Sequence, residues 1–197
     1  MKHLKMLGLA AIAALGLMAF VGAGTASATT LATDSAGTIK YAAGTTLHAT
    51  LETGTSATLT DTSGNTIATC TGSTVHGTIG TASGTWVEGA NSSLTWEGCN
   101  QTTDTVNLGS MDIMQTTGDE GEVRSTGSNV TLQIFGVSCT YGTGEGTKLG
   151  TITGGEAPTM KITATIPKTA GGFLCPSTGI WHASFIITSP HAVHIVP

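Results

Sequence analysis

The feature that most restricts the fold is the absence of helical periodicity after Ala28. Short runs rich in β-branched residues alternate polar and apolar side chains instead, as the segment from Thr45 to Leu51 does. Two such runs, Ala57 to Thr60 and Thr66 to Cys70, flank Asp61-Thr62-Ser63-Gly64-Asn65, whose Gly and Asn accept the positive φ of a tight turn. Alternation with period two buries one face of a strand, so the pattern predicts β-structure.

The number of such runs predicts the fold class. About 10–12 candidate strands follow residue 29, with turn residues roughly every 8–12 positions, as in antiparallel sandwiches and barrels. The 39 threonines fit this class, because a branched Cβ suits a pleated strand and the hydroxyl tolerates the solvent face. We predict one all-β domain over residues 29–197, an antiparallel β-sandwich of jelly-roll or Greek-key type. No segment is long or biased enough to act as a linker.

The first 28 residues have the order of a secretory signal peptide. Lys2 and Lys5 precede an uncharged apolar run from Met6 to Ala23, and Ala26-Ser27-Ala28 forms an A-x-A cleavage site. A transmembrane anchor is the alternative, since the run approaches the length that spans a bilayer. The Ala- and Gly-rich composition and the cleavage site favour a cleaved signal helix over residues 1–28, with no membrane span after it. We therefore expect a secreted protein, either extracellular or associated with the cell envelope.

The net charge argues against a nucleic-acid partner. The chain has 7 Lys and Arg against 12 Asp and Glu, a formal net charge of −5 at pH 7. A chain of this charge repels phosphate, so we expect no nucleic-acid binding. Only 10% of the residues are charged, which leaves sheet edges poorly protected against pairing with another chain.

Four cysteines, Cys70, Cys99, Cys139 and Cys175, lie in the part predicted to be exported. An even number in such a chain indicates two disulfides, and the absence of a C-x-x-C pair argues against a zinc ribbon or a thioredoxin-type site. Four cysteines allow three connectivities. We favour Cys70–Cys99 with Cys139–Cys175, because sequential pairing gives each half of the chain its own cross-link; free buried thiols are the remaining alternative.

Residues with catalytic or metal-binding chemistry are sparse. The sequence contains no G-x-S-x-G elbow, no P-loop and no evident Ser/His/Asp group. His191 and His194 are three positions apart, which places them on opposite faces of a strand. Asp119, Glu120 and Glu122 do not match a calcium-binding EF-hand loop. We therefore predict no catalytic residue, no metal site and no cofactor, with a secreted hydrolase of unrecognised site as the enzyme alternative.

The aromatic side chains allow two interpretations. Exposed together they would form a platform for stacking on sugar rings, whereas buried they would belong to the core. Trp96 and Trp181 lie close in sequence to cysteines of the proposed disulfides, as core tryptophans do in sandwiches. We therefore assign the aromatic group to the core: Trp86, Trp96, Trp181, Tyr41 and Tyr141.

Several motifs between Cys70 and Pro197 carry a family resemblance. They are Cys70-Thr71-Gly72-Ser73-Thr74-Val75-His76-Gly77-Thr78, Ser93-Leu94-Thr95-Trp96-Glu97-Gly98-Cys99, Cys139-Thr140-Tyr141, Cys175-Pro176, Trp181-His182-Ala183-Ser184-Phe185 and Ser189-Pro190. With these motifs the chain resembles small exported actinobacterial proteins with no assigned activity. The resemblance implies an all-β exported domain with two disulfides and brings no catalytic residues. The chain is also similar to neocarzinostatin-type apoproteins, although it is longer and its cysteines are more widely spaced.

Two functional hypotheses follow from these observations. The first is a secreted or envelope-associated, non-enzymatic β-domain with a structural or interaction role. Its candidate partners are an envelope component, a glycan and a second copy of the chain. The alternative is an extracellular binding module for a glycan or an apolar small molecule, held at one end of the sandwich or on exposed aromatic residues.

Overall fold

The computed structural model describes residues 28–197, and its regular secondary structure consists of strands. This confirms the all-β prediction; the predicted signal helix lies outside the described residues. No helix within residues 28–197 is long and apolar enough to cross a membrane. The sequence predicted about 10–12 strands, and the described chain has 14: β1 Thr30–Ala32, β2 Thr46–Leu51, β3 Ala57–Thr60, β4 Thr66–Ser83, β5 Trp86–Cys99, β6 Thr103–Asn107, β7 Ser110–Thr117, β8 Glu120–Thr126, β9 Asn129–Ile134, β10 Val137–Gly142, β11 Thr147–Thr153, β12 Thr159–Ala170, β13 Thr178–Ser189 and β14 His194–Val196.

The main sheet closes on itself. Hydrogen-bonded pairing runs from β4 through β5, β7, β8, β11 and β12 to β13. β13 pairs with both β2 and β3, and each of these also pairs with β4, so the ring is complete. The result is a closed eight-stranded antiparallel barrel with extra strands. The antiparallel part of the prediction is confirmed, whereas the sandwich is not confirmed, because the sheet forms one ring.

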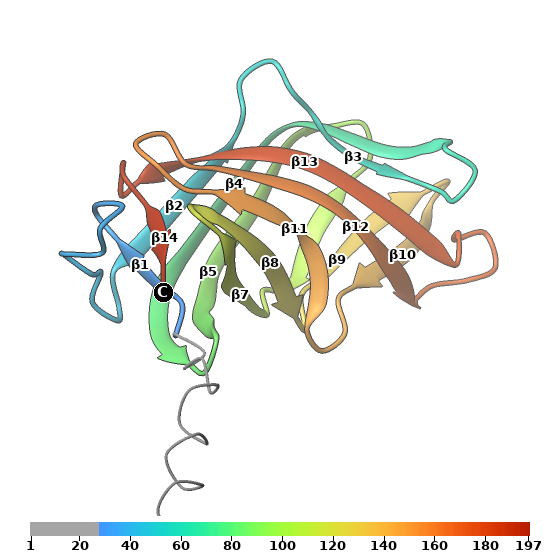
Figure 1. Cartoon of the computed structure of the whole chain (residues 1–197). Helices are drawn as coiled ribbons and strands as arrows, with labels where there is room; N and C mark the ends of the chain where they lie inside the picture. Colours follow the sequence, from blue (N-terminus) through green and yellow to red (C-terminus); the bar gives the residue numbers. More distant parts are fainter. Residues whose placement is uncertain (1–27) are drawn as a thin grey trace, which may run out of the picture.

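Some long strands pair with one neighbour at one end of the barrel and with a different neighbour at the other end. β12 pairs with β11 through Thr159–Ile162, and its last residues, Lys168 and Ala170, pair with β10. β10 in turn pairs with β9, and β9 with β6. Figure 1 shows the β9–β10 and β12–β13 turns at one end of the barrel and the β1–β14 pair at the other.

The β1–β14 pair contributes apolar side chains to the core at its end. Leu31 from β1 and Val193 and Ile195 around β14 are buried in the same apolar cluster as the barrel strands. A Cβ at Gly121 on β8 would lie 3.0 Å from Cδ1 of Ile195, so the missing side chain leaves room for this packing. The two chain ends of the described domain therefore pack together on the barrel.

Strand alternation follows the period-two pattern of the sequence. On β12 the residues Met160, Ile162, Ala164 and Ile166 are buried, and the residues between them are exposed. The predicted turn at 61–65 is confirmed: the Asp61 backbone N–H donates to the carbonyl oxygen of residue 65 at 2.8 Å, and φ at residue 64 is +85°. Only glycine adopts that φ without strain.

Both predicted disulfides are confirmed. Cys70 on β4 bonds Cys99 on β5, and these residues are also cross-strand neighbours. Cys139 on β10 bonds Cys175 in the β12–β13 loop. No cysteine among the described residues is free. Two disulfides are consistent with an extracellular location.

Glu122 on β8 provides a test of surface electrostatics on the barrel wall. Its carboxylate accepts hydrogen bonds from Lys148 at 2.7 Å and from Arg124 at 2.8 Å. These bonds, that from Lys148 first, lower the pKa of Glu122 from its ordinary value of 4.5. Stability from this group is therefore present above pH 4.5 and lost as the pH falls through the lowered pKa.

We expect Glu122→Gln to lower the free energy of unfolding at pH 7 by about 0.5–1 kcal/mol, because Lys148 is largely exposed and Arg124 is partly exposed, so solvent screens both ion pairs. Urea unfolding at several pH values measures the difference between variant and wild type. That difference should shrink below pH 4.5. A difference independent of pH would show that packing, rather than charge, accounts for the effect.

Candidate ligand-binding cavity

The barrel interior contains an apolar cavity of about 90 Å³. Each strand from β3 to β13 contributes at least one residue to its wall. Its wall includes the half-buried tryptophans Trp96 and Trp181, the fully buried Phe185 and the buried Leu132 and Met160. The cavity is smaller than an engineered apolar protein cavity of about 150 Å³ that binds benzene and xenon, and it shares the apolar lining of that cavity.

Two of the predicted core aromatics meet in this wall. The rings of Trp96 and Trp181 pack edge to face, with centroids 5.8 Å apart and planes at 66°. Both side chains pack against the buried core, as the sequence predicted. Trp86 differs, because the guanidinium of Arg124 stacks over its ring at 4.4 Å. The three tryptophans therefore do not form a shared platform.

Trp181, a residue of the cavity wall, carries an unsatisfied polar atom. The indole Nε1 of Trp181 is buried and has no hydrogen-bond partner among the described residues. A buried donor without a partner costs about 1–3 kcal/mol. An acceptor atom supplied by a bound molecule would remove that cost.

Several other polar side chains of the wall are hydrogen-bonded within the protein. The Ser125 and Ser128 hydroxyls are 2.8 Å apart, and that of Thr143 lies 3.2 Å from Ser125. Ser128 also donates to the carbonyl oxygen of Leu108 at 2.7 Å, as the Asn91 amide does at 3.0 Å. Because these groups are satisfied internally, the cavity presents mainly apolar surface to a ligand.

Tyr141 adds a rigid polar anchor to the wall. It is buried, and its hydroxyl donates to the carbonyl oxygen of Pro176 at 3.0 Å. Burial raises the pKa of Tyr141, so the hydroxyl stays neutral. The bond ties β10 to the segment that follows Cys175, beside the Cys139–Cys175 disulfide. The wall is therefore held by a covalent and a hydrogen-bonded link at the same place.

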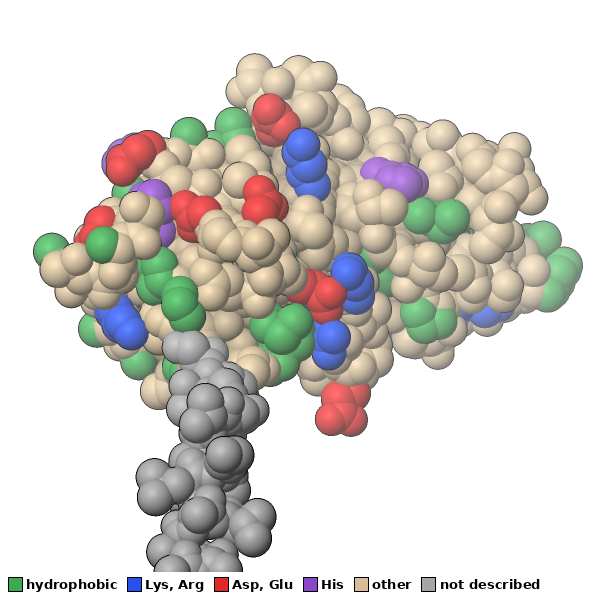
Figure 2. All heavy atoms as spheres, in the orientation of Figure 1, with side chains coloured by type: hydrophobic (Ala, Val, Ile, Leu, Met, Phe, Trp, Pro, Cys, Tyr) green, Lys and Arg blue, Asp and Glu red, His purple; other side chains and the backbone are tan. Residues whose placement is uncertain are grey.

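Charged groups are absent from the cavity wall, which includes no Asp, Glu, Lys, Arg or His among the described residues. On the face drawn in Figure 2, acidic and basic side chains are scattered over a surface that is largely uncharged. The catalytic arrangement that the hydrolase alternative requires, a His or carboxylate beside a cavity-lining Ser or Thr, is not found in this wall.

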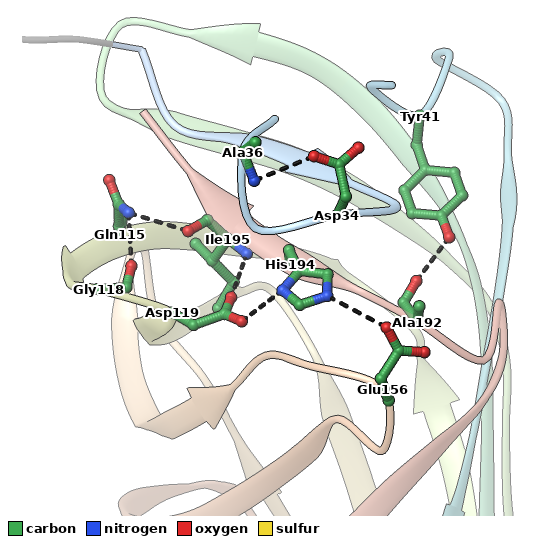
Figure 3. Close-up of polar contacts among 10 residues, drawn as sticks. All are labelled: Asp34, Ala36, Tyr41, Gln115, Gly118, Asp119, Glu156, Ala192, His194 and Ile195. Atoms are coloured by element: carbon green, nitrogen blue, oxygen red, sulfur yellow. Dashed lines mark hydrogen bonds and ion pairs between the residues drawn. The ribbon is translucent and has the colours of Figure 1, made fainter. Parts of the chain in front are cut away.

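A second polar cluster lies at the opposite end, around His194 (Figure 3). Its Nδ1 is 2.6 Å from Oδ2 of Asp119, and its Nε2 is 3.8 Å from Oε1 of Glu156. The other oxygen of Asp119 accepts the backbone N–H of Ile195 at 2.6 Å. These contacts hold β14 against the β7–β8 turn, so we interpret the cluster as a structural contact that anchors the C-terminal strand.

Tyr41 joins the same region. Its hydroxyl donates to the carbonyl oxygen of Ala192 at 2.5 Å. Burial, and then the negative charge of Glu156, raise the pKa of Tyr41, which keeps the hydroxyl available as a donor. The tyrosine links the β1–β2 connection to the residues that precede β14. This bond therefore helps the contacts of His194 to hold β14 in place.

The acidic residues near position 120 do not converge on one point. The carboxylate of Asp119 turns to His194, that of Glu120 accepts the hydroxyl of Thr153, and that of Glu122 pairs with the basic residues described above. His191 is exposed, whereas His194 is buried. Each of these predicted candidates thus has a separate environment.

The Asp119→Ala variant tests whether Asp119 anchors the C-terminal strand. We expect the free energy of unfolding to fall by about 2–3 kcal/mol, because two buried donors lose a charged acceptor. Amide hydrogen exchange should show faster exchange at Ile195 than in the wild type. The exposed Glu145→Ala is the matched control and should change neither measurement. Unchanged exchange at Ile195 in Asp119→Ala would contradict this role.

The sequence identified the two tryptophans as core residues but not the cavity that they line. The small polar residues Ser125 and Thr143 also line the cavity. Ser125 belongs to an ordinary alternating strand pattern and Thr143 to a loop, so nothing in the sequence distinguishes them from other serines and threonines. The unpartnered nitrogen of Trp181 is visible only in three dimensions. Comparisons of the chain with protein-family models, with curated proteins and with solved structures find no match.

Proposed function

We propose that the protein is an exported, non-enzymatic binding module that takes a small apolar molecule into the barrel cavity. The observation that carries the proposal is the apolar cavity of about 90 Å³ whose wall includes Trp96 and Trp181. Pockets that bind small molecules are mostly apolar, with few polar groups that fix orientation. This favours a binding module over a purely structural envelope protein.

The chemistry of the wall describes the ligand class. Phe185, Met160 and the two tryptophan rings offer apolar and aromatic contact area, which favours a compact ring or branched hydrocarbon skeleton. The unpartnered N–H of Trp181 favours one hydrogen-bond acceptor on that skeleton, such as a carbonyl oxygen. A glycan is less suited, because its many hydroxyls would lose water without finding partners.

Export belongs to the same proposal. The signal-like residues 1–28 and the two disulfides support release from the cytoplasm. The ligand would then be met outside the cell or within the envelope. A binding role is compatible with both partner hypotheses. One is attachment to an envelope component, and the other is association with a second copy of the chain.

Titration followed by tryptophan fluorescence tests the proposal. Cyclohexane and cyclohexanone serve as apolar probes, and cellobiose and chitotriose as glycan probes. We expect a saturable change in emission with both apolar probes at one site per chain, and none with the glycans. Saturable binding of the glycans alone would favour the glycan interpretation, and a flat response to all four probes would remove the binding proposal.

A variant of Trp181 tests the acceptor preference. Trp181→Phe keeps an aromatic ring in the wall but removes the N–H, and Trp96 remains as the reporter. We expect the affinity for cyclohexanone relative to cyclohexane to fall by about 2- to 10-fold, the worth of one neutral hydrogen bond. An unchanged ratio would show that this nitrogen does not contact the ligand.

A further inference from the structure

Two histidines lie side by side on the outer surface of the barrel. His48 on β2 and His76 on β4 are direct cross-strand partners, and their rings stack with centroids 4.1 Å apart and planes at 27°. Both side chains are half-buried. Their neighbours Ala49 and Val75 are buried, so the histidines occupy the solvent face of the sheet, away from the cavity.

A threonine on the third strand fixes the state of one imidazole. The Thr188 hydroxyl lies 2.8 Å from Nδ1 of His48 and donates to the carbonyl oxygen of the same residue at 3.3 Å. A hydroxyl has one hydrogen, so the arrangement that satisfies both contacts has Nδ1–H donating to Thr188. That tautomer leaves the lone pair on Nε2 of His48 available to a ligand.

This geometry points to a metal site: we propose that His48 and His76 together bind a divalent first-row transition-metal ion, Cu²⁺ most tightly. Neutral imidazole is a preferred ligand of Cu²⁺, Ni²⁺ and Zn²⁺, and Cu²⁺ stands highest in the general affinity order. A second-shell bond that holds the tautomer of a ligating histidine is a recurring feature of such sites. Thr188 supplies that bond here.

The two side chains are close enough to bind one ion together. Imidazole nitrogens bind these ions at about 2.0–2.1 Å, so two adjacent ligand nitrogens sit roughly 3 Å apart. The rings are stacked, and an imidazole lone pair lies in the ring plane, so the χ angles of one or both histidines must change to direct both Nε2 atoms to one ion. The backbone beneath them is fixed, because the flanking pairs Leu47↔Gly77 and Ala49↔Val75 keep the register of β2 and β4.

The site is built from two protein ligands. The residues that the structure describes contain no group of three or more His, Cys, Asp or Glu side chains suited to hold a metal ion. Water would therefore complete the coordination, and the site would exchange metal readily rather than hold it as a structural ion. The net charge of −5 favours the approach of a cation.

Calorimetric titration of the purified, untagged protein with Cu²⁺ tests the proposal, together with electron paramagnetic resonance of the bound ion. We expect one site per chain with nitrogen hyperfine splitting. His48→Gln and His76→Gln should each weaken binding by about tenfold or more, since each removes one of two chelating nitrogens. Thr188→Val should weaken it by about 10-fold while retaining the nitrogen signal.

His182→Gln is the matched control, because His182 lies half-buried on the outer face of β13 outside this pair. It should bind Cu²⁺ as the wild type does. Circular dichroism confirms that each variant keeps its strands. The proposal is overturned if the wild type shows no stoichiometric site, or if His48→Gln and His76→Gln bind Cu²⁺ as tightly as the His182→Gln control.

Discussion

Cys139→Ala combined with Cys175→Ala is expected to lower the free energy of unfolding by about 3.8 kcal/mol. The disulfide closes a loop over 36 residues, and loop-closure entropy in the unfolded chain sets the size of the effect. Affinity for the apolar probes should fall as well. Tyr141 in the cavity wall is bonded to the carbonyl oxygen of Pro176, next to Cys175, and the released loop would loosen that bond.

Urea unfolding and probe titration of the same variant check both effects. Cys70→Ala with Cys99→Ala is the matched comparison, with an expected loss of about 3.6 kcal/mol from a separation of 29 residues. This second pair joins neighbouring strands that remain hydrogen-bonded without it. Because Cys70 itself lines the cavity, the probe affinity of the Cys139/Cys175 variant is compared with that of the wild type, and an unchanged affinity would show that this link has no role in the cavity wall.

Ala68→Phe is expected to abolish binding of the apolar probes, with a loss in affinity of at least about 100-fold. Ala68 on β4 is buried and lines the cavity, so a phenyl group at this position would occupy the space proposed for the ligand. Overpacking in a core typically costs about 1–3 kcal/mol, which a protein with two disulfides is expected to tolerate. Fluorescence titration with cyclohexane measures the affinity.

Two further variants distinguish filling of the cavity from general disruption of the barrel structure. Ala57→Leu adds volume to the same cavity from β3 and should also weaken binding. Thr69→Leu changes the half-buried neighbour of Ala68, which does not line the cavity, and should bind as the wild type does. Wild-type affinity in a folded Ala68→Phe variant would place the bound molecule outside this cavity.

The sequence predicted most of the local structure correctly. Alternation identified strands such as β3 and the first part of β4, and the turn between them followed from Gly64 and Asn65. The length of β4 did not follow from local pattern. This strand continues through Gly72, where a Cβ would lie 3.1 Å from Cβ of Glu97 on β5, so close strand packing rather than a turn explains the glycine.

The alternation of polar and apolar residues could not predict that the sheet closes into a barrel. Strands of a sandwich and of a barrel both bury every second side chain, so β12 reads the same in either fold. The difference lies in which strands pair. The ring closes through β2 and β3, two short strands that both bridge β13 and β4. Such pairing depends on register between segments far apart in sequence.

The candidate site was predictable only in part. Proximity to the cysteines placed Trp96 and Trp181 in the core, and the structure agrees. The same reasoning does not explain Trp86, whose ring lies under the Arg124 guanidinium. A cavity is the space that neighbouring side chains fail to fill, and that space depends on rotamers and barrel shape rather than on residue spacing.

The central claim is that the barrel cavity lined by Trp96, Trp181 and Phe185 admits a small apolar molecule. A crystal of the wild-type protein held under xenon pressure tests it most directly, because xenon occupies apolar cavities without needing a specific contact. The account predicts a xenon peak bounded by Trp96, Trp181 and Phe185, and no peak there in Ala68→Phe. An ordered wild-type crystal with these rings in place and no xenon in the cavity that they line would contradict it.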